Sequence, residues 1–172
     1  MAPMISRVSE ARRFAALVRE RGLIPGIVVE VPATAIMAAM VMREVDFCSI
    51  GTNDLIQYTM AADRLSADLF ELTDPWQPAG LRLINTVVQA AKKCGKPVSI
   101  CGESASDPYL AQVFVGMGVD SLSMAPNAVP EVGVALEKWN MRHYQDLAQE
   151  VLKAEGTHHT RRIASDYFAQ LK

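Results

Sequence analysis

Residues 47–64 read FCSIGTNDLIQYTMAADR, and this segment carries the clearest structural signal of the chain. Its first four residues form a short, almost unalternating run of apolar and small residues. Such a run predicts a strand that is buried on both faces, as in a parallel sheet. The small-residue turn Gly51–Asp54 follows directly and leads into a helix. The stretch therefore has the pattern of a βα unit.

Four other short runs repeat this pattern along the chain. They are APMI (2–5), GIVV (26–29), VSIC (98–101) and SLSM (121–124). Amphipathic helices are expected between the runs, over residues 8–18, 36–41, 81–91 and 107–117. Alternation of strand and helix predicts right-handed crossovers and a parallel α/β sheet.

The apolar stripes also predict which helix faces are buried. In the second helix we expect the core side chains to be Ile36, Met37, Met40 and Val41. Gly95 and Pro97 should end the third helix, and Asp107-Pro108 should open the fourth. Beyond Met124 the sequence predicts a loop flanked by Pro126 and Pro130. Two helices should then pack outside the sheet, with apolar side chains at 144, 147, 151 and 152 and at Ile163, Tyr167, Phe168 and Leu171.

Composition limits the classes of protein to consider. The chain has 172 residues, of which 50% are hydrophobic and 21% charged, and its formal net charge is −2. No basic stripe indicates a nucleic-acid partner. No apolar stretch is long enough for a membrane span, and none has the form of a signal peptide. Three cysteines without a CxxC pair predict reduced thiols and a cytoplasmic protein.

Polar residues occur where the predicted strands end. Glu30 follows GIVV, Asn53 and Asp54 follow FCSIGT, and Cys101 and Glu103 close VSICGE. Ligands of α/β proteins bind beyond the carboxyl ends of parallel strands. These residues are therefore expected to converge on one pocket. The long interval between Ile50 and Val98 is a further place for functional residues.

Each candidate residue has a plainer alternative. Glu30 and Asp54 are two carboxylates that suit Mg2+, although Glu30 could instead pair with a basic residue. The backbone N–H groups and the Asn53 amide of the GTND turn could hold anionic oxygens, or Asp54 could merely cap a helix. Arg64 offers a fork for phosphate or carboxylate, although most single arginines are surface residues.

The cysteines and histidines also have both a chemical and a purely structural interpretation. Cys101 lies beside Gly102 at a strand end, where a thiol can act as a proton donor or a nucleophile. Most buried cysteines are simply small apolar residues, and we interpret Cys48 and Cys94 in that way. His143, His158 and His159 have no acidic or hydroxyl partner at a telling spacing and are expected at the surface.

Taken together, the motifs resemble a known family. VDFCSIGTNDLIQYTMAADR (45–64) is similar to the signature of enzyme I of the bacterial sugar phosphotransferase system, a phosphoenolpyruvate–protein phosphotransferase. MAPMIS, GIVVEVPA, ICGESASDP and GMGVDSLSMAP accompany it in the family's order. The resemblance covers roughly residues 1–140. Pyruvate phosphate dikinases and phosphoenolpyruvate synthases share the GTNDL and CGE elements, whereas QYTMAADR looks more like enzyme I.

The resemblance implies roles for individual residues. Glu30 and Asp54 match magnesium ligands, and Asn53, Asp54 and Arg64 match contacts to phosphoenolpyruvate (PEP). Cys101 matches the acid that protonates the enolate carbon to give pyruvate. The implied reaction is Mg2+-dependent transfer of the PEP phosphoryl group to a histidine on a separate domain, and then to a histidine-containing phosphocarrier protein.

The resemblance also implies an architecture. The fold expected is a (β/α)8 TIM barrel of the phosphoenolpyruvate/pyruvate type, represented here by about its last five βα units. Residues 1–140 would form these units and residues 141–172 the C-terminal helices, with the histidine domain absent. The chain alone is expected to be inactive in phosphoryl transfer and to form a homodimer. The alternatives are a non-catalytic dimerisation or PEP-binding regulatory module, and a dikinase or PEP synthase-type enzyme.

Overall fold

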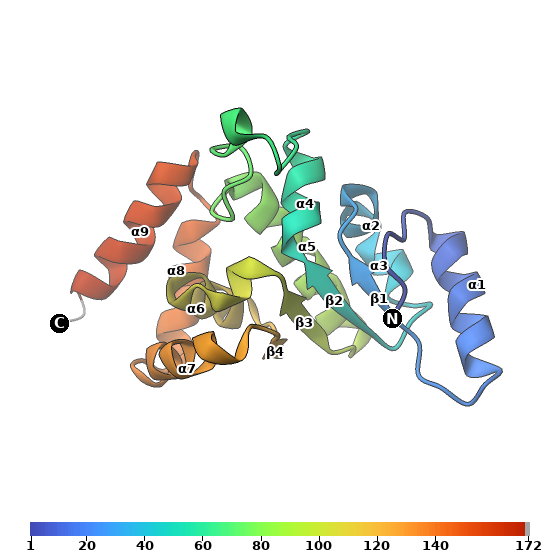
Figure 1. The fold of residues 1–172 in the computed structure, drawn as a ribbon. Helices are drawn as coiled ribbons and strands as arrows, with labels where there is room; N and C mark the ends of the chain where they lie inside the picture. Colours follow the sequence, from blue (N-terminus) through green and yellow to red (C-terminus); the bar gives the residue numbers. More distant parts are fainter. Residues whose placement is uncertain (171–172) are drawn as a thin grey trace.

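Four strands form one parallel sheet, with neighbours in the order of the sequence. They are β1 (Gly26–Val29), β2 (Phe47–Gly51), β3 (Val98–Cys101) and β4 (Ser121–Leu122). The structure is a computed structural model that describes residues 1–170. The chain advances across the molecule from α1 at one end to α9 at the other (Figure 1). The predicted parallel α/β fold is confirmed. Within the described residues β1 and β4 are the outer strands, so this sheet is open.

The register of the sheet separates its two faces. Since side chains alternate along a strand, aligned residues share a face. One row is apolar, with its first three members almost fully buried: Val29, Ile50, Ile100 and Leu122. The adjacent row on the opposite face is mostly small and polar: Val28, Ser49, Ser99 and Ser121. The prediction of strands buried on both faces fits β2 but is wrong for β3 and β4, because Ser99 is only partly buried and Ser121 is exposed.

The predicted first strand, residues 2–5, is wrong. Ala2 makes only an isolated parallel bridge to β1, through hydrogen bonds with Gly26 and Val28. Met4 has a φ of 55°, which is outside the range of extended backbone and turns the chain away from the sheet. The described chain therefore has four strands where five were predicted.

Four helices largely follow their sequence signals. They are α1 (Val8–Arg19), α4 (Thr52–Thr59), α5 (Pro78–Cys94) and α6 (Pro108–Met117). Gly95, with a φ of 65°, ends α5 as predicted, and the Asp107 carboxylate accepts hydrogen bonds from the first amides of α6. Two 3-10 turns, η1 (Ala67–Leu69) and η2 (Glu103–Ser106), lie after α4 and β3.

The second predicted helix differs in both shape and orientation. It consists of two short helices, α2 (Pro32–Ile36) and α3 (Ala38–Val41), which meet at Met37. Both pack against α5, and their buried side chains include the small residues Thr34, Ala35 and Ala38. Ile36, Met37 and Met40 are instead exposed, by 68%, 40% and 54%. Of the predicted core face, only Val41 is correct.

The segment after β4 contains one helix more than predicted. After η3 (Pro126–Ala128), α7 spans Val129–Glu137. It begins within the loop predicted between Pro126 and Pro130 and continues where no helix was predicted. Pro130 lies in the first turn of α7, where a proline costs no helical hydrogen bond. The two predicted final helices are α8 (Met141–Val151) and α9 (Thr157–Gln170). The predicted contacts of Leu171 and of the Phe168 side chain fall outside what the structure describes. Over residues 1–170, no helix has the length and apolarity needed to cross a membrane.

Candidate functional site at the strand ends

Glu30 follows β1 and leans over the end of β2. Its side chain is buried, and its Oε1 accepts a hydrogen bond of 2.7 Å from the Met4 amide. A Cβ on Gly51 would lie only 2.8 Å from Oε2 of Glu30. The Glu30 carboxylate therefore fits in this position because residue 51 is a glycine. Among the described residues, Glu30 forms no ion pair with a basic side chain. The alternative of a pair with Arg or Lys is therefore not supported.

The GTND turn begins α4 without a break. Gly51 is the N-cap and Thr52 the first helical residue, so Asp54 lies inside the first turn and does not cap the helix. The Asn53 Oδ1 accepts from the Glu103 amide at 3.3 Å. Because this contact uses the amide oxygen, the amide NH2 of Asn53 is directed elsewhere and is available as a donor. An acidic residue in the first turn also suits the helix dipole.

Cys101 ends β3 directly beside this turn, because it pairs in register with Gly51. Its thiol donates weakly to the Ile50 carbonyl, with Sγ 3.5 Å from the oxygen. The hydroxyl of Thr52 donates to the Cys101 carbonyl at 3.2 Å and lies 2.6 Å from the Ser104 hydroxyl. Gly102 has a φ of 106°, and a Cβ there would lie 2.6 Å from Thr52 Oγ1. Only glycine therefore allows β3 to approach the start of α4 so closely.

A cavity of ≈ 500 Å³ opens beside these strand ends. Asn53 and Glu103 line it, together with Arg64 from the loop after α4. The other lining residues are Ile56, Leu65, Phe70, Thr73, Asp74, Pro75, Ser104 and Arg161. Glu30, Asp54 and Cys101 are not among them. The structure thus places Glu30 and Cys101 around the GTND turn, and Arg64 with Asn53 on the adjoining cavity.

The donor set limits the kind of cation that could bind. No group of three or more His, Cys, Asp or Glu side chains among the described residues could hold a metal ion. A metal site built from three or more of these four side-chain types is therefore not present in that part of the chain. Mg2+ does not require one, because it commonly takes one or two carboxylates and completes its shell with water and phosphate.

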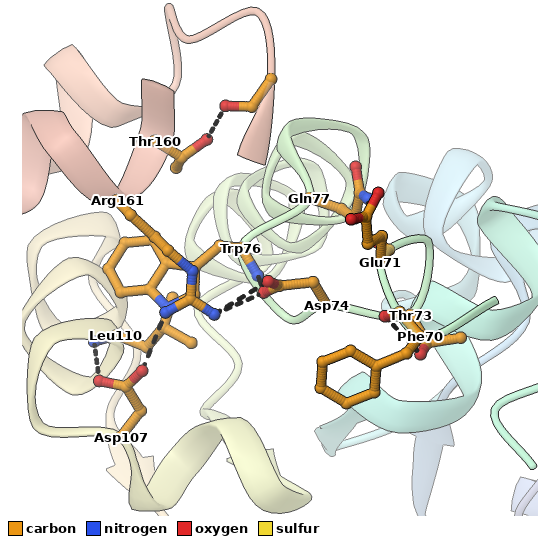
Figure 2. Close-up of polar contacts among 11 residues, drawn as sticks. Phe70, Glu71, Thr73, Asp74, Trp76, Gln77, Asp107, Leu110, Thr160 and Arg161 are labelled. Carbon is orange, nitrogen blue, oxygen red and sulfur yellow. Dashed lines mark hydrogen bonds and ion pairs between the residues drawn. The ribbon is translucent and has the colours of Figure 1, made fainter. Parts of the chain in front are cut away.

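One wall of the cavity rests on a contact that the sequence patterns did not predict, between Arg161 and the turn that contains Asp74 and Trp76. Figure 2 shows the Arg161 side chain of α9 beside Trp76, with its guanidinium directed at Asp74. The Trp76 indole N–H donates in turn to Asp107, the capping residue of α6, at 3.1 Å. Arg161 and Asp74 are 87 positions apart, so no local spacing signals their contact. The hydroxyls of Thr52 and Ser104 were missed for a similar reason.

Cys48 is predicted to be chemically inert in the folded chain. It is buried within β2, and burial, helped by the charge of Asp120, raises its thiol pKa to about 12. Only the thiolate is nucleophilic, and at pH 8 roughly one Cys48 in ten thousand would be ionised. Iodoacetamide should therefore modify the partly exposed Cys94 and Cys101 while Cys48 stays unmodified, as measured by mass spectrometry of peptides. In urea all three should react, and fast native labelling of Cys48 would contradict its placement.

Other features lie away from the strand ends. A cavity of ≈ 550 Å³ between α6 and α7 is lined mainly by apolar side chains, including Tyr109, Val134 and Trp139. None of the three histidines lines the strand-end cavity. The prediction of a surface position is right for His158, whereas His143 and His159 are partly buried and His143 packs its ring near Trp139.

Comparison with known proteins agrees with the family resemblance of the sequence motifs. The family described as PEP-utilising enzyme, PEP-binding domain, matches residues 1–141. A phosphoenolpyruvate-protein phosphotransferase of Streptomyces coelicolor is 43% identical over 166 residues, which cover 95% of this chain. Proteins of the same name from Bacillus subtilis and Haloferax volcanii are 37% and 43% identical over 91% and 90% of it. The chain spans 30% of the length of each of these relatives.

Proposed function

The chain belongs to the PEP-utilising enzymes through their PEP-binding domain, and on that premise we propose that it is the PEP-binding region of a phosphoenolpyruvate–protein phosphotransferase. The proposed reaction moves the phosphoryl group of PEP to a histidine on a separate domain and releases pyruvate. The observation that carries the proposal is the meeting of Glu30, Asn53 and Cys101 at three neighbouring strand ends. In the proposed architecture the open sheet is one part of a (β/α)8 barrel.

The carboxylates of Glu30 and Asp54 are the proposed ligands of Mg2+. Glu30 is a buried carboxylate that receives one amide hydrogen bond and no basic partner among the described residues. An unneutralised buried carboxylate is costly unless a cation accompanies it. When bound, Mg2+ would supply positive charge beside the substrate oxygens. The donor chemistry of this pair fits a hard divalent ion.

Asn53 and Arg64 are the proposed contacts to the anionic groups of PEP. The Asn53 NH2 can donate to an anionic oxygen, since the amide oxygen is used by Glu103. Arg64 forms no ion pair among the described residues, so its guanidinium can bind phosphate or carboxylate. Both side chains line the same cavity.

Cys101 is the proposed acid of the final step. When the phosphoryl group leaves PEP, the remaining enolate must gain one proton on its methylene carbon. The thiol gives up its proton there, the new C–H bond forms from the π electrons of the enolate, and a thiolate remains on Cys101.

The phosphoryl acceptor and the partners are also proposals. None of the histidines of this chain lines the cavity, which favours an acceptor histidine on another domain. That domain would pass the phosphoryl group to a histidine-containing phosphocarrier protein. We further propose that two copies of the chain associate, for which the exposed Ile36, Met37 and Met40 offer an apolar surface.

PEP binding is the direct test of the proposed function. Titration calorimetry of the 172-residue chain with PEP should detect binding that depends on Mg2+. Arg64→Ala should weaken this binding by about 10-fold to 100-fold, because it removes charge-assisted hydrogen bonds. Asp54→Asn should weaken it comparably and should also reduce its dependence on Mg2+.

Matched substitutions separate these effects from a general change of charge. Asp68→Asn alters an exposed carboxylate of η1 that does not line the cavity, and it should leave PEP affinity unchanged. The proposal is wrong for this chain if PEP binds equally well without Mg2+, or if Arg64→Ala and Asp54→Asn bind PEP like the unaltered chain.

A further inference from the structure

The loop between α4 and α5 forms one wall of the strand-end cavity but buries little of itself. Leu65 and Phe70 line the cavity and are still 87% and 74% exposed. Trp76 is the one large apolar side chain of this loop that is fully buried. Apolar burial alone therefore stabilises the position of this loop, which contains Arg64, only weakly.

Most polar contacts of this wall are local. The Arg64 amide donates to Gln57, the Leu65 amide to Asp63, and the Gln77 side chain to the Glu71 carbonyl. Each joins residues only a few positions apart. Such contacts shape a turn, but they do not fix where the turn lies relative to the strand ends.

Arg161 makes the long-range connection. Its Nη2 lies 2.9 Å from both carboxylate oxygens of Asp74, and its guanidinium carbon lies 5.4 Å from the centre of the Trp76 ring. Trp76 is held in addition by Asp107. Figure 2 shows these side chains meeting from three elements, with Arg161 coming from α9. The contact therefore ties the loop to α9 on one side and to α6 on the other.

We propose that Arg161 is a positioning residue for PEP, acting through the wall that it holds. By fixing Asp74 and Trp76, it keeps the loop and Arg64 in the binding arrangement. Arg161 also lines the cavity, and its Nη2 is engaged by Asp74. In this proposal the influence of Arg161 on an anion passes through Arg64. This inference rests on the proposed PEP-binding function and adds α9 to the parts of the chain on which that function depends.

The exposure of Arg161 decides what kind of effect to expect. Its side chain is 48% exposed, and an ion pair that is open to solvent contributes little to global stability. Loss of the contact instead lowers the fraction of molecules with the wall in place. Apparent affinity falls in proportion to that fraction.

The first test compares Arg161→Ala with Arg162→Ala, which removes the same charge from the next, exposed position of α9. In the absence of any ligand, Arg161→Ala should speed hydrogen exchange of the amides in residues 61–77 by about fivefold, and Arg162→Ala should not. Thermal unfolding should be almost the same for both variants. Unchanged exchange in Arg161→Ala would show that Arg161 does not hold the wall.

The second test measures PEP affinity in the presence of Mg2+. Arg161→Ala should bind PEP about fivefold more weakly, Arg161→Lys should be intermediate, and Arg162→Ala should be unaffected. In an Arg64→Ala background, Arg161→Ala should have little further effect, because the two residues act in series. Full additivity would mean that Arg161 contacts PEP itself, and the positioning role would be wrong. If the unaltered chain binds no PEP, the proposed function fails, while the exchange comparison still decides the role of Arg161.

Discussion

Gly116→Ala should lower the free energy of unfolding by about 3 kcal/mol, one of the largest losses expected from adding a single methyl group to this chain. Gly116 lies on α6, where that helix packs against α8. A Cβ at this position would lie 1.9 Å from the Tyr144 carbonyl oxygen and 3.0 Å from the Ala148 side chain. The nearer contact is with backbone, which cannot rotate away, so the two helices would have to separate.

The separation would disturb more than one pair of helices. Tyr144 is buried, and its hydroxyl donates to the Ala135 and Leu136 carbonyls of α7. A shift of α8 therefore strains its connection to α7 as well. Urea unfolding followed by circular dichroism should show a lower midpoint with a similar slope.

Gly133→Ala provides the matched control. Gly133 is also within a helix, α7, and a Cβ there would have no heavy atom within 4 Å. Alanine favours a helix over glycine by about 1 kcal/mol, so this variant should be slightly more stable than the unaltered chain. If both variants changed stability equally, the close approach of α6 and α8 would be refuted.

Sequence patterns predicted the sheet well because its strands are short apolar runs that end at polar residues. β1, β2 and β3 lie where GIVV, FCSI and VSIC predicted them. The same reasoning failed for residues 2–5, since nothing in APMI announces the positive φ of Met4. It failed again in α2 and α3. There the buried residues are the small Thr34, Ala35 and Ala38, whereas the larger Ile36 and Met40 are exposed.

The strand-end residues could be predicted for a different reason. Glu30, Asn53 and Cys101 each follow an apolar run, and parallel strands bring those positions to one edge. Asp74, Trp76 and Arg161 have no such marker, because their contact depends on where α9 returns in space. Local periodicity does not predict where α9 packs, so the contact among the three residues is visible only in the three-dimensional structure.

Cys101→Ala should slow the exchange of pyruvate methyl protons with solvent deuterium by about 100-fold to 1,000-fold. An acid that protonates the enolate carbon must, in the reverse direction, remove a proton from the pyruvate methyl group. The Cys101 thiolate would take that proton, exchange it with solvent, and return a deuteron to the enolate. Proton NMR of pyruvate in deuterium oxide with Mg2+ and the 172-residue chain measures the rate. This reaction requires no phosphoryl acceptor, so it tests Cys101 separately from the rest of the proposed transfer.

Cys94→Ala is the control, because Cys94 is also partly exposed but ends α5 away from the strand-end residues. It should exchange pyruvate protons like the unaltered chain. Equal exchange in Cys101→Ala would remove this residue from the proton-donor role and leave it as a packing residue against Ile50. Loss of exchange with PEP affinity retained would instead separate proton transfer from binding. Binding is assigned to Asn53 and Arg64 around the cavity, whereas Cys101 ends the neighbouring strand outside its lining. Substitution of Cys101 should therefore abolish proton exchange without abolishing PEP binding, and substitution of Arg64 should weaken PEP binding directly.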